Sequence, residues 1–346
     1  MIDPQVGRSH GGDVQPKHRK NPVALRALLG FFLMGMVCLP VAIGAGLYLA
    51  LNGTFSGLGL SGVTSAPRLE ESTVSILPGS SKGRVTILLL GTDQRDGETA
   101  PPRTDTIIVA TIDPQTKSAG ILSLPRDLWV TVPGYGSERI NSAFELGELA
   151  KKGGGPEMAR KTVEHLLGVP VNHYALIGFA GFQKLVDEVG GVMVDVERPI
   201  KDNEYPDQKY SLRRIFFQPG LQRLDGESAL WYVRTRHADS DFGRARRQQQ
   251  FLLGLRTQAL QLNLVSKAPA IMSALSDTIK TDLRPTEILS LARIAKDLDS
   301  SKVINRVVDE AVTSHWVTPA GAQVEVPNKD AVKRLVLEIF GSGARV

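Results

Sequence analysis

Residues 27–51 carry no charged side chain, and this stretch of 25 residues constrains the chain more than any other feature of its sequence. A helix needs roughly 20 apolar residues to cross the hydrocarbon core of a bilayer. The glycines and the proline within the stretch are tolerated in transmembrane helices, where neighbouring groups satisfy the backbone. A cleaved signal peptide is the alternative, but its apolar part is usually about 7–15 residues long. The sequence therefore predicts one transmembrane helix over residues 27–51.

Positive charge gathers on the N-terminal side of this stretch. Five basic residues precede it, opposed only by Asp3 and Asp13, and the next charged residue after it is Arg68. Because the cytoplasmic flanks of transmembrane helices are enriched in Lys and Arg, the tail 1–26 is expected in the cytoplasm. We therefore expect a single-pass protein of the cytoplasmic membrane whose larger part, residues 84–346, lies outside.

The composition excludes several classes of protein. Hydrophobic residues make up 42% of the chain and charged residues 22%, which is typical of a folded protein. The net charge of +5 is too small and too dispersed to indicate a nucleic-acid partner, and none is expected. The single cysteine, Cys38, excludes intrachain disulfides and a multi-cysteine zinc site. Residues 52–83, rich in Gly, Ser and Thr, predict a flexible tether outside the membrane.

Two apolar runs at the start of the folded part predict buried strands. Residues 84–91 and 106–112 are almost continuously apolar, as is typical of strands covered on both faces of a sheet. Residues 156–167 and 179–189 have the apolar spacing of helices and end at glycines, and 192–196 returns as a strand. The pattern predicts an α/β fold, a three-layer α-β-α sandwich around a largely buried mixed sheet.

No internal repeat or clear linker interrupts the chain after the tether, so one domain is expected. It divides into a core, residues 84–256, and a C-terminal extension, residues 257–346. Residues 198–214 carry eight charges and two prolines, which predict an exposed loop near the sheet. Helical periodicity at 288–298 and again at 332–339 predicts two helices in the extension.

Acidic side chains follow the first predicted strand and precede the second. Asp93 ends the motif Gly91-Thr92-Asp93, and Asp105 lies within Arg103-Thr104-Asp105-Thr106. Ligands bind at strand ends in α/β sheets, and two carboxylates there can hold a hard cation such as Mg²⁺. In extended chain Arg103 would point the same way as Asp105, which would add a phosphate-binding group. For each acid taken alone, a turn or helix-cap role is the alternative.

Five arginines fall within residues 234–247. Arg234 and Arg236 share one face if their segment is a strand. The planar guanidinium group matches phosphate oxygens, so the cluster fits a diphosphate. A solvated basic face is the alternative. His237 has no nearby Ser or Cys with which to form a triad, and it is given no role.

A helix is predicted to begin near Asp241 and to continue with the apolar residues of a buried face. On this helix Arg244 and Gln248 are one turn apart on a common side. A helix N-terminus presents oriented N–H groups, which would add to the anion-binding character of the arginines.

Seven short motifs stand in the order and spacing of one family, and over residues 84–256 the chain resembles the LytR-CpsA-Psr family. The motifs are Gly91-Thr92-Asp93, Arg103-Thr104-Asp105-Thr106, Ser123-Leu124-Pro125-Arg126-Asp127, Ile140-Asn141-Ser142-Ala143-Phe144, Leu224-Asp225-Gly226-Glu227-Ser228-Ala229-Leu230, Arg234-Thr235-Arg236 and Asp241-Phe242-Gly243-Arg244-Ala245-Arg246-Arg247-Gln248-Gln249. Members of the family are membrane-anchored phosphotransferases that move a glycopolymer from an undecaprenyl diphosphate carrier to the cell wall, commonly to peptidoglycan. The resemblance implies the same activity here.

The resemblance also implies roles by motif position. It would make Asp93 and Asp105 the ligands of Mg²⁺, and Asp241 a residue that orients arginines. The residues it places around the diphosphate are Arg103, Arg126, Arg234, Arg236, Arg244 and Gln248. Arg139 stands where many relatives have Lys, and no role is assigned to it.

Two other functions use the same residues. A polyprenyl diphosphate hydrolase would use water as the nucleophile in place of an acceptor hydroxyl. A non-catalytic sensor or wall-binding module would hold an anionic polymer with the arginines and would gain nothing from the two carboxylates. No general base is evident for the transferase, although Asp93 or Asp105 is a candidate.

Overall fold

The computed structural model describes residues 83–94, 99–207, 211–261, 277–296, 298 and 302–341. The predicted cytoplasmic tail, transmembrane helix and tether, up to residue 82, lie outside the described residues. Within the part of the chain that is described, no helix is long and apolar enough to cross a membrane.

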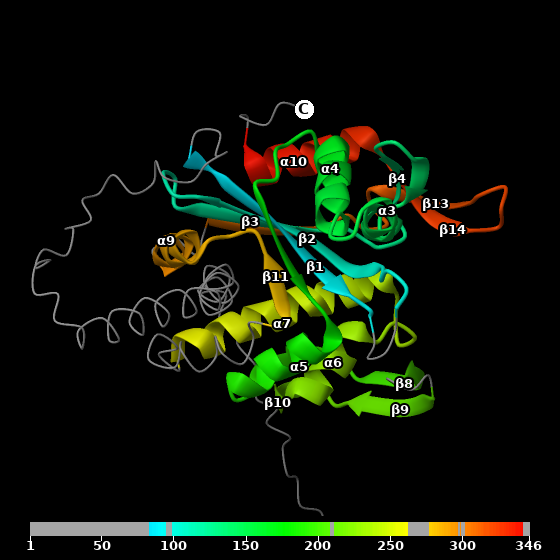
Figure 1. Cartoon of the computed structure of the whole chain (residues 1–346). Coiled ribbons are helices and arrows are strands. Elements are labelled where there is room, and N and C mark those ends of the chain that lie inside the picture. Colours follow the sequence, from blue (N-terminus) through cyan, green and yellow to red (C-terminus); the bar gives the residue numbers. More distant parts are fainter. Residues whose placement is uncertain are drawn as a thin grey trace, which may run out of the picture.

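A six-stranded mixed sheet in the order β11-β6-β1-β2-β3-β12 forms the centre of the fold (Figure 1). Its strands are β1 (Val85–Thr92), β2 (Thr104–Asp113), β3 (Ser118–Ser123), β6 (His173–Ile177), β11 (Ile279–Thr281) and β12 (Val303–Val307). β2 runs antiparallel to both β1 and β3, whereas β6 is parallel to β1 and β12 to β3. The first six residues of β1 are all buried, as predicted for a strand covered on both faces.

One face of the sheet is covered by three of the described helices, α3 (Ser142–Ala150), α4 (Gly155–Leu167) and α10 (Lys329–Phe340). Leu88 and Val109 of the sheet pack there with Val163 of α4 and Val336 of α10. The predicted helix at 156–167 is confirmed, with Pro in its first turn and a left-handed glycine after its end.

The other face packs against α7 (Asp241–Gln261) and α9 (Pro285–Lys296). Ile87, Ile108 and Ile121 of the sheet meet Leu291 of α9 and Leu252 of α7 in a second apolar cluster. The α/β class and its three layers are therefore confirmed, and α7 begins where the sequence predicts.

A further apolar cluster lies beyond α7, on the side away from the sheet (Figure 1). Its elements are α5 (Phe179–Glu188), β7 (Val192–Val196), β8 (Ile200–Pro206), β9 (Leu212–Phe217), β10 (Gly220–Leu224) and α6 (Gly226–Arg234). β7 pairs with β10, apart from the central sheet. α7 approaches β7 so closely that a Cβ at Gly254 would lie 2.3 Å from the carbonyl oxygen of Met193. Glycine allows this contact between helix and strand.

The prediction of an exposed loop at 198–214 is wrong, because most of this segment forms the β8–β9 hairpin. Most of its charged residues that the structure describes are exposed, while Ile200, Tyr205 and Ile215 face inward and are buried together with one carboxylate, that of Asp202. This alternation is that of a half-buried antiparallel ribbon. A count of charges over the whole segment does not reveal this alternation.

The C-terminal extension holds the two predicted helices, α9 and α10, and also strands that the sequence analysis does not predict. β12 joins the central sheet, while β13 (Thr313–Val317) and β14 (Gln323–Pro327) form a protruding hairpin (Figure 1). This hairpin lies beside a second ribbon, β4 (Trp129–Val132) with β5 (Gly136–Arg139).

Candidate active site

A β-bulge on β2, opposite the end of β1, sets the positions of two carboxylates, those of Asp105 and Asp93. Gly91 pairs with Thr106 and Thr92 with Thr104, so Asp105 is an extra residue on β2 without a partner on β1. Such bulges bend a strand and redirect a side chain. The backbone N–H of Arg103 donates to Asp93 Oδ1 at 3.1 Å, which fixes the second carboxylate beside the bulge.

Arg126, which follows β3, is the centre of the charged network. Its Nη1 donates to Asp105 Oδ1 at 2.9 Å, and its Nε lies 3.3 Å from Asp127 Oδ2 and 3.6 Å from Asp241 Oδ1. Burial disfavours its charge, but the three carboxylates outweigh this effect and raise the pKa of the guanidinium above its ordinary value. Arg126 is therefore a fixed positive charge at the strand ends.

The first turns of α7 supply the next groups. Arg244 is 5% exposed, and its Nη2 lies 2.7 Å from Asp241 Oδ1, so Asp241 bridges Arg244 and Arg126. Burial lowers the pKa of the Arg244 guanidinium, although Asp241 counteracts it. One turn later, Gln248 Nε2 donates to Thr106 Oγ1 at 2.9 Å, which ties α7 to the bulged strand. The predicted common side of Arg244 and Gln248 is thus observed.

Arg234 and Arg236 do not lie on a strand, contrary to that part of the sequence prediction. Arg234 is the last residue of α6, a helix that begins where the Asp225 side chain accepts a hydrogen bond from the backbone N–H of Ser228. Arg234 Nη1 donates to the hydroxyl of Tyr205 at 2.7 Å. Its guanidinium carbon lies 4.0 Å from the ring centroid of Phe179, a cation–π contact.

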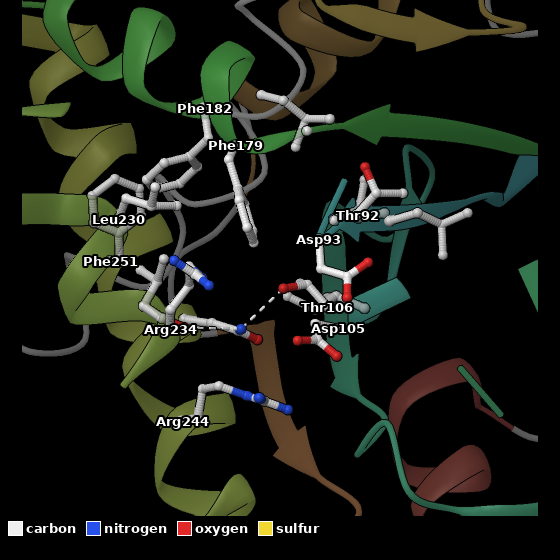
Figure 2. A pocket seen from close by; sticks show the side chains of 18 of the residues that line it. Thr92, Asp93, Asp105, Thr106, Phe179, Phe182, Leu230, Arg234, Arg244 and Phe251 are labelled. Carbon is white, nitrogen blue, oxygen red and sulfur yellow. Dashed lines mark hydrogen bonds between the residues drawn. The ribbon is translucent and has the colours of Figure 1, made fainter. Parts of the chain in front are cut away.

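These groups meet in one cavity of about 340 Å³ between the strand ends and α5, α6 and α7. Figure 2 shows the carboxyl groups of Asp93 and Asp105 on one side of it and Arg234 and Arg244 on the other. Of the residues predicted for the site, those that line the cavity are Asp93, Asp105, Arg126, Arg234, Arg236, Arg244 and Gln248. Asp241 lies behind them and contacts two of the arginines.

Arg103 is, besides Asp241, the other predicted residue that does not line this cavity. It lies just before β2, and its Nε donates to Glu145 Oε2 of α3 at 2.7 Å. Its side chain is 48% exposed. The expectation that Arg103 and Asp105 point the same way rests on extended chain, and the bulge at Asp105 breaks that alternation.

Two further arginines of the cluster at 234–247 also point elsewhere. Arg246 pairs with Asp309 at 3.2 Å, and Arg247 is buried against Asp239 and the carbonyl oxygens of Tyr232 and Thr235. The cluster is therefore neither one solvated basic face nor one pocket. It divides between the lining of the cavity, a surface ion pair and internal packing.

The inner wall of the cavity is apolar, and sequence reasoning did not identify it. It is formed by Leu176, Phe179, Phe182, Leu185, Leu230, Val233, Phe251, Leu252, Leu255 and Ile279. These side chains have the same periodicity as core residues, so no local signal marks them. Tyr205 was missed as well, because it lies in the segment interpreted as a loop.

His237 also lines the cavity, paired with the buried carboxylate of Asp202. Both carboxylate oxygens lie 3.2 Å from His237 Nδ1. Asp202 also accepts hydrogen bonds from Thr235 Oγ1 at 2.5 Å and from the backbone N–H of Glu204 at 2.9 Å. This carboxylate therefore joins the β8–β9 hairpin to the segment that carries Arg234 and Arg236.

We expect Asp202→Asn to lower the free energy of unfolding by about 1–3 kcal/mol, because one acceptor oxygen becomes a donor and a buried partner loses its hydrogen bond. Urea denaturation followed by circular dichroism measures the change. Asp195→Asn, at an exposed position of β7, is the control and should shift stability by less than about 0.5 kcal/mol. Equal stability of the two variants would show that Asp202 does not join these segments.

Two of the carboxylates that line the cavity, those of Asp93 and Asp105, fit a magnesium ion. Mg²⁺ is usually bound through one or two carboxylates together with phosphate oxygens of a substrate. Asp93 and Asp105 supply two carboxylates on the same side of the cavity. Among the described residues, no cluster of three or more His, Cys, Asp or Glu side chains forms a complete protein-only metal site. The donor set suits a cation that is shared with a phosphate ligand.

The fold and the cavity define an α/β protein with one cavity that has charged residues at the strand ends and an apolar inner wall. Residues 61–335 match the model of the LytR_cpsA_psr family. The chain belongs to this family, and the resemblance drawn from its motifs is confirmed.

Relatives with assigned names support this membership. The chain is 36% identical over 228 residues to the polyisoprenyl-teichoic acid--peptidoglycan teichoic acid transferase TagU of Enterococcus faecalis, covering 65% of this chain and 70% of that one. It is 33% identical over 264 residues to the regulatory protein MsrR of Staphylococcus aureus, covering 74% and 75%.

Solved structures share the fold. B. subtilis TagV superposes with a TM-score of 0.61 at 30% identity, covering 75% of this chain and 98% of that chain. TagT bound to LI-WTA gives a TM-score of 0.59 at 26% identity, covering 80% and 100%. The α/β architecture is thus shared with the solved structures of TagV and TagT.

Proposed function

We propose that the protein is a cell-wall glycopolymer transferase that takes its polymer from a polyprenyl diphosphate carrier and releases polyprenyl monophosphate. The main observation in support of this proposal is that one cavity has arginines and carboxylates at the strand ends and an apolar wall behind them. A diphosphate bonded to an isoprenoid chain is likewise charged at one end and apolar at the other. Relatives named as polyisoprenyl-teichoic acid--peptidoglycan teichoic acid transferases support this assignment.

The charged end of the cavity would bind the diphosphate. Arg126, Arg234 and Arg244 approach it from three different elements, so they can contact several phosphate oxygens at once. Their positions are fixed before the ligand binds, by Asp105 and Asp241 on one side and by Tyr205 on the other. Such preorganised charge contributes more to phosphoryl transfer than covalent chemistry by the protein does.

The reaction is an in-line displacement at the phosphorus that carries the sugar. A hydroxyl oxygen of the acceptor forms a bond to this phosphorus, and its proton passes to water. The bond between this phosphorus and the bridging oxygen of the diphosphate breaks. Its electron pair leaves with polyprenyl monophosphate, whose charge the arginines balance. Magnesium held by Asp93 and Asp105 would supply further charge neutralisation at the phosphate oxygens.

The proposal includes location at the cytoplasmic membrane. The uncharged stretch 27–51 would anchor the chain, with the basic tail 1–26 inside and the described domain outside. The donor's isoprenoid chain and the acceptor wall would then both be within reach of the cavity.

We expect the full chain in detergent with Mg²⁺ to release polyprenyl monophosphate from a polyprenyl diphosphate sugar, and Arg234→Ala combined with Arg236→Ala to slow release about 100-fold or more. Thin-layer chromatography of a radiolabelled lipid measures release. Unchanged release in the double variant would contradict the proposed site.

The choice of acceptor separates the transferase from the two alternatives. With a peptidoglycan glycan present, a transferase forms a covalent conjugate, whereas a hydrolase yields only the free phosphorylated sugar. A binding module would release nothing from the carrier. It would also keep or gain polymer binding in Asp93→Ala, because that change removes a negative charge.

A further inference from the structure

Two tryptophans from distant parts of the chain meet next to the segment that carries Arg126. Trp129 begins β4 and Trp316 lies on β13, and their ring centroids are 6.0 Å apart at an interplanar angle of 67°. Trp129 is half-buried, whereas Trp316 is 42% exposed. The chain contains three tryptophans, and these are two of them. An exposed tryptophan supported edge-to-face by another is a rigid aromatic surface open to solvent.

The backbone holds this aromatic pair against the segment that carries Arg126. The N–H of Glu325 on β14 donates to the carbonyl oxygen of Asp127 at 3.0 Å, and Leu128 forms a parallel bridge with Glu325. On β13 and β14, Trp316 pairs with Val324. The β13–β14 hairpin is therefore paired with the segment that follows Arg126. Trp129 comes three residues after Arg126, and three residues of backbone span at most about 11 Å.

Arg139 joins the aromatic pair to the charged network. It is the register partner of Trp129 across β4 and β5, so both side chains leave the same face of that ribbon. Its Nε lies 3.2 Å from Asp127 Oδ1, and its Nη2 donates to the carbonyl oxygen of Gln323 on β14 at 2.8 Å. Two ion pairs thus lead from Arg126 through Asp127 to Arg139, which is the register partner of Trp129.

The charge around the pair does not suit an anionic membrane surface. β13 and β14 contain no Lys or Arg, and their ionisable residues are His315 and Glu325, which lie 3.1 Å apart. The other protruding hairpin differs, since β9 carries Arg213 and Arg214 next to exposed Leu212 and Phe216. In Figure 1 the hairpins β8–β9 and β13–β14 lie on the same side of the molecule. Of the two, β8–β9 carries basic and exposed apolar residues together, whereas β13 and β14 contain neither Lys nor Arg.

We propose that Trp316, backed by Trp129, binds the pyranose rings of the acceptor, a strand of linked N-acetylated amino sugars. The faces of indole rings are electron-rich and attract the polarised C–H groups on one face of a sugar ring. A sugar stacked on Trp316 would direct the following units of the strand along Arg139 toward Arg126. This assignment rests on the proposed transferase function and names the part of the site that holds its second substrate.

Binding of a β-1,4-linked N-acetylglucosamine tetramer, followed by tryptophan fluorescence of the full chain in detergent, tests the assignment without turnover. We expect a saturable change in emission, and Trp316→Ala should weaken binding at least about tenfold. Trp316→Phe should keep most of the affinity, because an aromatic face remains. The matched control is Val317→Ala, at an exposed neighbouring position, which should bind as the unaltered chain does.

Absence of binding in the unaltered chain, or equal affinity in Trp316→Ala, would overturn the assignment. So would contact of Trp316 with lipid. In a chain with Trp129→Phe and Trp231→Phe, Trp316 is the remaining tryptophan. Strong quenching of its emission by brominated phosphatidylcholine in reconstituted vesicles would show that this surface faces the bilayer and not a glycan.

Kinetics distinguish failure of this assignment from failure of the proposed function. We expect Trp316→Ala to raise the KM for the glycan acceptor about tenfold and to leave kcat at saturating acceptor nearly unchanged. An unchanged acceptor KM with normal release overturns only the assignment to Trp316. If the unaltered chain, supplied with donor and acceptor together, releases no polyprenyl monophosphate, the transferase proposal fails, and the fluorescence experiment still decides whether Trp316 binds a glycan.

Discussion

Replacing Arg126 by alanine is expected to lower the rate of release from the polyprenyl diphosphate donor by about 100-fold or more, with the domain still folded. Arg126 is the central cation of the site, since it lies within 3.6 Å of carboxylate oxygens of Asp105, Asp127 and Asp241. Without it, these three carboxylates face a dianionic ligand with one guanidinium fewer. Single-turnover release of polyprenyl monophosphate measures the loss.

Arg126→Lys separates the effect of charge from that of geometry. Lysine keeps the positive charge but cannot contact Asp105 and Asp241 through a planar fork, so an intermediate rate is expected. The matched control is Arg306→Ala, which removes a surface guanidinium paired with Glu338 and should leave release unchanged. A rate for Arg126→Ala within about threefold of the unaltered chain would exclude Arg126 from a role in phosphoryl transfer.

The sequence predicts those parts of the site whose geometry is local. The start of α7 at Asp241 fixes Arg244 and Gln248 on one side of a helix, because residues four apart always share a face. The buried strands β1 and β2 are also predictable from the sequence, since both faces of each strand are apolar. Acids placed at the ends of such strands must come close to one another, and Asp93 and Asp105 do line the same cavity.

The parts that could not be predicted depend on contacts between distant segments. Arg234 ends a helix instead of lying on a strand, and its orientation is set by Tyr205 and Phe179 from two other elements. Arg103 points away from the cavity because a single bulged residue, Asp105, changes the direction in which the neighbouring side chains point. No spacing rule within one segment contains this information.

The apolar wall of the cavity was missed for a different reason. Phe251 follows Gln248 on α7 at a spacing that predicts a core position, and it is indeed buried with the third apolar cluster. It lines the cavity as well. Because one side chain serves both, periodicity alone assigns it to the core, and only the fold shows that the core continues into a binding surface.

We therefore expect Phe251→Ala to affect both stability and donor binding. Phe251 is 1% exposed, and its ring centroid lies 5.1 Å from that of Phe182. Truncation removes this aromatic contact and leaves a void beside the cavity, which should lower the free energy of unfolding by about 3–5 kcal/mol. Urea denaturation measures the loss.

The same change should raise the KM for a long-chain polyprenyl donor more than for a short-chain donor, because only the long chain reaches the inner apolar wall. Phe251→Leu is the matched variant. It keeps an apolar side chain of similar reach and should recover most of the stability while losing the ring contact with Phe182. If Phe251→Ala destabilises the fold but leaves the ratio of the two KM values unchanged, Phe251 is a core residue only, and the isoprenoid chain lies elsewhere.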